Sequence, residues 1–142
     1  MANVIPYAFR GELFTGTHNF ASGGDSFKLA LYTSNPYNTS STVYVVTNEQ
    51  SSSGGSNYTA AGNALPGNAV VSTGAVATCD FADTTWTSAT ITAAFGTIYN
   101  DDKSDKVCVV LDFGGSKTCT NGTFKISFPD PSTPGDAIIS MA

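Results

Sequence analysis

Apolar residues recur at every fourth position near the start of the chain, at Ile5, Phe9 and Leu13. Residues with this spacing lie on one face of a helix, so the pattern predicts a short helix within residues 3–16. Gly16 is a residue type that commonly ends helices. Two interpretations are open: the apolar face packs on the helix's own domain, or the segment is an arm that docks on a neighbouring subunit.

A different pattern begins near residue 26, where residues alternate with the period of two that is typical of strands. Phe27, Leu29 and Leu31 form the first such series. Similar runs follow, separated by turns rich in glycine, asparagine and aspartate. The predicted strands cover residues 27–32, 69–73, 76–81, 86–94, 95–99, 106–113 and 118–128.

The segment 106–113 is apolar on both faces, which predicts a central strand that is buried on both sides. Gly114 and Gly115 then predict a two-residue turn into the strand over 118–128. The same alternation indicates which side chains form the core. They include Trp86, Val109, Leu111, Phe124 and Ile126.

Short strands with such turns predict an all-β fold, an antiparallel β-sandwich or a jelly-roll-like barrel with a short N-terminal helix. The expected parts are an N-terminal arm over 1–25, a β-sandwich domain over 26–128 and an extended C-terminal tail over 129–142. The β domain contains a long polar loop, 47–67, whose centre of serine and glycine cannot form a core of its own. Tyr58 and Leu65 are expected to pin the ends of this loop to the body.

The composition limits the partners that this chain can have. Its 142 residues suit one domain with a core of its own. The net charge is −5 and the few basic residues are scattered, which argues against nucleic acid as a partner. No apolar run approaches the ~18 residues of a membrane span, so no membrane partner is expected. The first residues lack the pattern of a secretory signal, and we expect synthesis in a cytoplasm without export by the general route.

Catalysis needs titratable groups gathered in one place, and such groups are scarce here. Only 12% of the residues are charged, and His18 is the single histidine. No nucleophile motif accompanies His18, so we interpret it as a lone surface histidine rather than a general base paired with Glu12 or Asp25. The acidic stretch 100–105 lacks the spacing and the glycine of an EF-hand loop, and we interpret it as a solvated turn. No enzymatic activity, metal or cofactor is expected.

The three cysteines are an odd number without metal-ligand spacing, so we expect small, buried and free thiols at Cys79, Cys108 and Cys119. Trp86 is interpreted as a core residue in preference to a sugar-binding one. Tyrosine supplies contact area at low entropic cost, and the loop tyrosines are better candidates for contacts. They are Tyr37, Tyr44 and Tyr58.

Several segments of the chain carry a family resemblance. They are GELFTGTHNF and DSFKLALYTS, then NYTAAGNAL, and in the second half DFADTTWTSATITAAFGTIYND, SDKVCVVLDFGG and KTCTNGTFKISFP. In order and spacing these segments resemble a family of small tailed-bacteriophage virion proteins, over most of residues 10–130. The resemblance implies a β-rich structural subunit that is present in many copies on the particle. It supplies no catalytic residue to carry over.

The function that we expect is that of a capsid decoration or cement protein, which binds and stabilises the assembled phage head. The partner is then the major capsid protein, and a homo-oligomer is expected, with a trimer favoured because it suits the local threefold axes of a capsid. The contact residues proposed for the arm and the loop are Ile5, Phe9, Leu13 and Tyr58. The alternative is a tail-fibre or tail-tip component that binds carbohydrate on the host surface.

Overall fold

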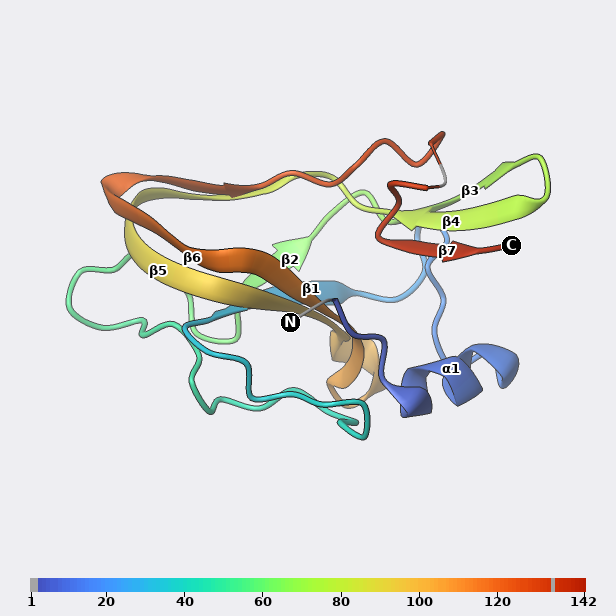
Figure 1. Cartoon of the computed structure of the whole chain (residues 1–142), viewed down its shortest axis with the longest axis horizontal. Helices are drawn as coiled ribbons and strands as arrows, with labels where there is room; N and C mark the ends of the chain where they lie inside the picture. Colours follow the sequence, from blue (N-terminus) through green and yellow to red (C-terminus); the bar gives the residue numbers. More distant parts are fainter. Residues whose placement is uncertain (1–2, 134) are drawn as a thin grey trace.

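The computed structural model describes residues 3–133 and 135–142, and it arranges the strands in two antiparallel sheets (Figure 1). The first sheet has the order β2-β1-β5-β6, and the second has the order β3-β4-β7. The elements are α1 (Tyr7–Phe14), β1 (Phe27–Tyr32), β2 (Asn63–Leu65), β3 (Ala69–Thr73), β4 (Val76–Asp80), β5 (Thr84–Asn100), the short 3-10 helix η1 (Asp101–Lys103), β6 (Lys106–Ile126) and β7 (Ile139–Met141). The predicted antiparallel β-sandwich with one short N-terminal helix is confirmed. The strands of the described residues do not close into a barrel.

The longest feature is the hairpin of β5 and β6, and it corrects one prediction. Gly114 and Gly115 do not form a turn between two strands but lie inside β6. At this point residues 113–116 of β6 lie opposite the single residue Ala94 of β5. The two glycines have φ angles of 69° and 127°, which L-residues with a side chain rarely adopt. The extra residues form a bulge, and both strands bend sharply at this point in Figure 1.

The start of β6 is buried on both faces, as predicted, but it is not central. β6 is the edge of its sheet, and irregular segments cover that edge. Val4 and Val110 exchange backbone hydrogen bonds of 2.9 and 2.8 Å, and Val43 forms a bridge to Lys106. Side chains from residues 107–110 are therefore enclosed without a further regular strand beside them.

The two faces of β1 contribute to two different apolar clusters. Leu29 and Leu31 belong to the main core between the sheets and α1, whereas Ala30 and Tyr32 face the segment that follows β1. The main core contains the predicted residues Trp86, Val109 and Phe124 as buried side chains, and Leu111 and Ile126 pack against it half-buried.

Of the two interpretations of the N-terminal helix, the structure supports packing on its own domain. Phe9 is 0% exposed and lies in the main core. The helix begins after Pro6 and ends with Gly16 N–H bonded to Leu13 O and Thr17 N–H bonded to Glu12 O. This pair of bonds is the Schellman arrangement of a helix C-terminus. The chain is thereby turned back beneath the helix.

The predicted arm and tail are integrated into the body. Residues 139–141 form β7 and pair with β4, so the end of the chain is part of a sheet rather than a tail stretched over a surface. The loop 47–67 also contains a strand, β2, which pairs with β1. Tyr58 and Leu65 are both buried, which confirms that they pin this loop to the body.

Candidate interaction surface

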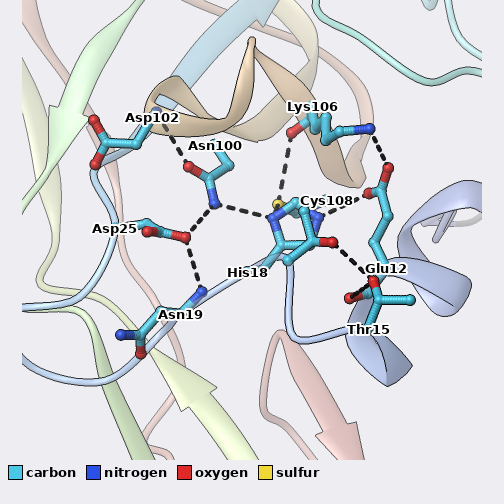
Figure 2. Close-up of polar contacts among 10 residues, drawn as sticks. Glu12, Thr15, His18, Asn19, Asp25, Asn100, Asp102, Lys106 and Cys108 are labelled. Atoms are coloured by element: carbon cyan, nitrogen blue, oxygen red, sulfur yellow. Dashed lines mark hydrogen bonds and ion pairs between the residues drawn. The ribbon is translucent and has the colours of Figure 1, made fainter.

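His18, which the sequence analysis placed on the surface, is a buried polar residue that packs against Phe9 of α1. That prediction is wrong, because the side chain is enclosed next to Phe9, with ring centres 5.1 Å apart. Its Nε2 lies 2.8 Å from Glu12 Oε2, and its Nδ1 lies 3.0 Å from Asn100 Nδ2 (Figure 2). The turn at the end of α1 brings His18 back toward Glu12, six residues earlier in the chain.

Asn100 decides which nitrogen of His18 carries the proton. The Asp102 backbone N–H donates to Asn100 Oδ1 at 3.2 Å, so the oxygen of the amide must face that way. The amide nitrogen then donates to Asp25 Oδ2 at 2.8 Å and to His18 Nδ1. Because Nδ1 accepts a hydrogen bond, a neutral imidazole carries its proton on Nε2. This N–H then donates a hydrogen bond to Glu12.

The two carboxylates of this network are held in the ionised form. Burial raises the pKa of Glu12, but hydrogen bonds from Lys106 and His18 outweigh burial and lower it overall. Burial likewise raises the pKa of Asp25, and the Asn19 backbone N–H and the Asn100 amide outweigh it. The network thus joins the segment around α1 to the β5–β6 connection through charge-assisted bonds.

One part of the network has the order of a nucleophile, a base and a carboxylate. Cys108 Sγ lies 4.0 Å from His18 Nδ1, and Glu12 holds the other nitrogen. Two observations oppose nucleophilic chemistry here. Cys108 is 0% exposed, and burial raises its pKa well above the ordinary value. The Nδ1 lone pair is also occupied by Asn100. We therefore assign this arrangement a structural role.

The acidic connection between β5 and β6 is engaged by lysines and backbone groups. Lys28 pairs with Asp101 at 2.9 Å, and Lys103 lies 3.4 Å from Asp25. Asp102 Oδ2 accepts from the Ser26 backbone N–H at 2.7 Å. Across residues 3–133 and 135–142, no group of three or more His, Cys, Asp or Glu side chains is placed to hold a metal ion.

Two of the four predicted contact residues are corrected, because Phe9 and Tyr58 are buried within the chain itself. The hydroxyl of Tyr58 donates to Glu49 Oε1 at 2.7 Å and accepts from the Leu31 backbone N–H at 3.0 Å. Glu49, which the sequence analysis missed, also accepts from Tyr44 and from the backbone of residue 61. The carboxylate therefore draws the loop tyrosines inward.

The aromatic residues considered for sugar binding are mostly interior as well. Trp86 and Tyr37 are buried. Tyr44 is half-buried and stacks on Tyr99 with ring centres 4.8 Å apart. These side chains do not combine into an exposed aromatic platform.

The other two predicted contact residues, Ile5 and Leu13, line a groove of about 260 Å³ between α1 and β7. Phe14 stands beside this groove with 88% of its surface exposed, and Met141 borders it from β7. A second hollow of about 270 Å³ shares Leu13, Ile139 and Met141 with the groove and reaches Val70 on β3. We call this combined region the α1–β7 surface. It consists of Ile5, Tyr7, Arg10, Leu13, Phe14, Val70, Ala77, Ile139 and Met141.

The outward side of α1 is where the sequence analysis missed a contact candidate. Tyr7, Arg10 and Phe14 follow one another at helical spacing and are all exposed. The Arg10 guanidinium lies over the Tyr7 ring, 5.5 Å from its centre. The signal was present in the sequence as a second, aromatic stripe of the helix. Of the stripe predicted as the contact face, Phe9 is buried in the core, and Ile5 and Leu13 stay half-buried at the groove.

No helix within the described parts of the chain is long and apolar enough to span a membrane. Comparison of the chain with known protein families, with curated proteins and with solved structures found no match.

Proposed function

We propose that the chain is a non-enzymatic structural protein of a tailed-phage particle, a decoration or cement subunit on the capsid surface that is made in the host cytoplasm. It binds the major capsid protein of the assembled head and stabilises the shell. The observation that carries this proposal is the α1–β7 surface. The family resemblance supports the same assignment.

The composition of the α1–β7 surface is suited to protein recognition. Exposed apolar patches of a folded domain mark interaction sites when they are contiguous. Tyrosine and arginine are enriched among residues that dominate binding energy, and here Tyr7 and Arg10 stand beside the exposed ring of Phe14. The partner surface is therefore expected to offer an apolar pocket for Phe14 and an acidic group for Arg10.

The surroundings of this surface hold it in a defined shape. The helix C-terminus is closed by backbone hydrogen bonds, and the His18 network ties the following segment to β5 and β6. A preformed surface loses little conformational entropy on binding. The buried positions of Cys108 and His18 support the non-enzymatic part of the proposal.

The test is binding to purified heads that were assembled without this chain. Phe14→Ala is expected to weaken binding at least about tenfold, because a central aromatic anchor contributes more than 1 kcal/mol. Its folding stability is expected to stay within about 0.5 kcal/mol of the parent, because the side chain is exposed. Val46→Ala is the matched control, since Val46 is 71% exposed but lies on the segment after β1.

Equal coating of heads by the parent and by Phe14→Ala would contradict the assigned surface. Discovery of the chain only at the tail tip would contradict the cement function and favour the carbohydrate-binding alternative.

A further inference from the structure

The hairpin of β3 and β4 presents an uncovered strand edge. β3 is the outer strand of the second sheet, and Figure 1 shows the hairpin projecting beyond β7. Proteins commonly protect such an edge with charges, proline or a bulge. Residues 69–79 contain no charged residue and no proline, and the register between β3 and β4 is regular. This edge is therefore open to pairing with another strand.

The turn of the hairpin sets the direction of its backbone groups. Gly74 and Ala75 connect Thr73 to Val76, which are opposite each other in the register. In a two-residue hairpin the closing pair exchanges hydrogen bonds, and bonded and non-bonded pairs then alternate along the strands. Thr73 is thus bonded to β4, and its neighbour in β3 is directed outward.

The alternation places the backbone groups of Val70 and Ser72 on the open edge. Val71 belongs to a bonded pair with Thr78, and Thr78 Oγ1 also donates to the Val71 carbonyl oxygen at 3.1 Å. The N–H and C=O groups of Val70 and Ser72 point the opposite way. Among the residues that the structure describes, these groups have no hydrogen-bond partner.

We propose that β3 pairs with β3 of a second copy of this chain, antiparallel about a twofold axis at Val71. In this register Val70 lies opposite Ser72 of the second copy, and the two residues exchange both backbone hydrogen bonds. The symmetry repeats this pair on the other side of the axis. Val71 then faces its own counterpart in a non-bonded pair, where side chains approach most closely.

Charge and self-complementarity favour a second copy as the occupant. Each chain has a net charge of −5, so copies repel where acidic groups meet. Residues 69–79 carry no charged side chain, so pairing along this stretch brings no acidic groups of the two copies together. The pairing also joins the β3-β4-β7 sheets of the two copies into one continuous sheet. It covers part of Val70, which is 51% exposed. It does not rest on the proposed function.

The test is the mass of the chain in solution across a range of concentrations, measured by sedimentation equilibrium. The parent is expected to dimerise. Ser72→Pro removes the outward N–H and is expected to weaken the dimer at least about tenfold, because two symmetry-related hydrogen bonds are lost. Proline is tolerated at an edge position whose N–H faces outward, so the monomer is expected to keep its unfolding midpoint. Ser72→Ala keeps the N–H and is the matched control, expected to dimerise like the parent.

A second variant keeps the proposal testable if Ser72→Pro fails to fold. Val71→Cys places two thiols across the axis, and oxidised glutathione is expected to convert them to an intermolecular disulfide with release of two equivalents of reduced glutathione. The parent, with its three native cysteines, is the control. A chain that stays monomeric, a trimer, or a Val71→Cys variant that forms no more covalent dimer than the parent overturns the proposal. A monomeric chain whose binding to heads is weakened by Ser72→Pro also overturns it, because the pairing strand then belongs to the shell.

Discussion

Asn100 uses both ends of its side-chain amide, and this makes it the residue on which the buried network depends. Its oxygen accepts from the Asp102 backbone, and its nitrogen donates to Asp25 and His18. Buried polar groups are tolerated only when such partners are present, since a group left without one costs its full desolvation energy. The isolated histidine of the sequence is therefore a well-partnered interior residue.

Asn100→Asp replaces the donating amide nitrogen with an oxygen and leaves the shape almost unchanged. The new carboxyl faces Asp25 and no longer donates to His18. We expect the free energy of unfolding at pH 7 to fall by about 3–5 kcal/mol, the range for an unpaired buried charge. Urea denaturation measures the loss. Asn121→Asp, at an exposed position, is the control, and equal midpoints for the two variants would show that the network does not hold the fold.

The residue scale also shows why His18 could not be placed from sequence. Its neighbours in the chain are polar or small, so no local periodicity marks it as buried. Its partner Asn100 is 82 residues away in the chain. Phe9, in contrast, belonged to an apolar series that the helix period could detect. Local pattern identified the helix, and the structure decided which side of it stays exposed.

Among the elements, β2 is a three-residue edge strand that is held by a close backbone approach. Gly62, directly before it, has a φ angle of 81°, and a Cβ there would stand 1.9 Å from the Leu29 carbonyl oxygen. The loop 47–67 therefore packs on β1 only because this position lacks a side chain. The sequence showed a loop rich in glycine but not which glycine the packing requires.

Gly62→Ala is expected to lower the free energy of unfolding by about 3 kcal/mol or more, because a backbone clash adds to the strain of the positive φ angle. Gly54→Ala is the matched control. Gly54 has a φ angle of 69° with nothing within 4 Å of the added carbon, so only strain of about 1 kcal/mol is expected. Thermal or urea unfolding of both variants measures the difference, and similar losses would rule out the close approach as the cause.

At the scale of the whole molecule, the ionised carboxylates couple stability to pH. Glu12 and Asp25 have lowered pKa values in the folded chain, since hydrogen bonds outweigh burial. A group of this kind stabilises the fold above its unfolded pKa, which is about 4. The stabilisation is lost as the pH falls through the lower, folded value, because protons then bind more strongly to the unfolded chain.

We therefore expect the urea midpoint to fall between about pH 5 and pH 3. Glu12→Gln is expected to lower stability at pH 7 and to flatten this decrease, because the ionised partner of Lys106 is gone. Asp136→Asn, an exposed position near the end of the chain, serves as the comparison. A Glu12→Gln variant with the same pH profile as the parent would exclude Glu12 as a source of the dependence.

The proposed pairing of β3 would have a consequence for binding to a shell. A twofold axis through Val71 and perpendicular to the sheet keeps the same face of both copies on one side. The α1–β7 surface lies on that face, because Val70 and Met141 border it. Two surfaces directed at one shell can bind at once, so weak single contacts combine into stable attachment.

The sequence by itself determined the class of the fold and most of its elements. Periods of two and of about four report which residues alternate between core and solvent, and this information is local. What only the tertiary structure decided involves residues far apart in the chain. The bulge at Gly114 and Gly115 continues β6 because residues of β5 pair on both sides of it. The edge of β6 is covered by Val4, more than 100 residues earlier. Such pairings depend on the geometry of two segments together, which neither segment's pattern contains.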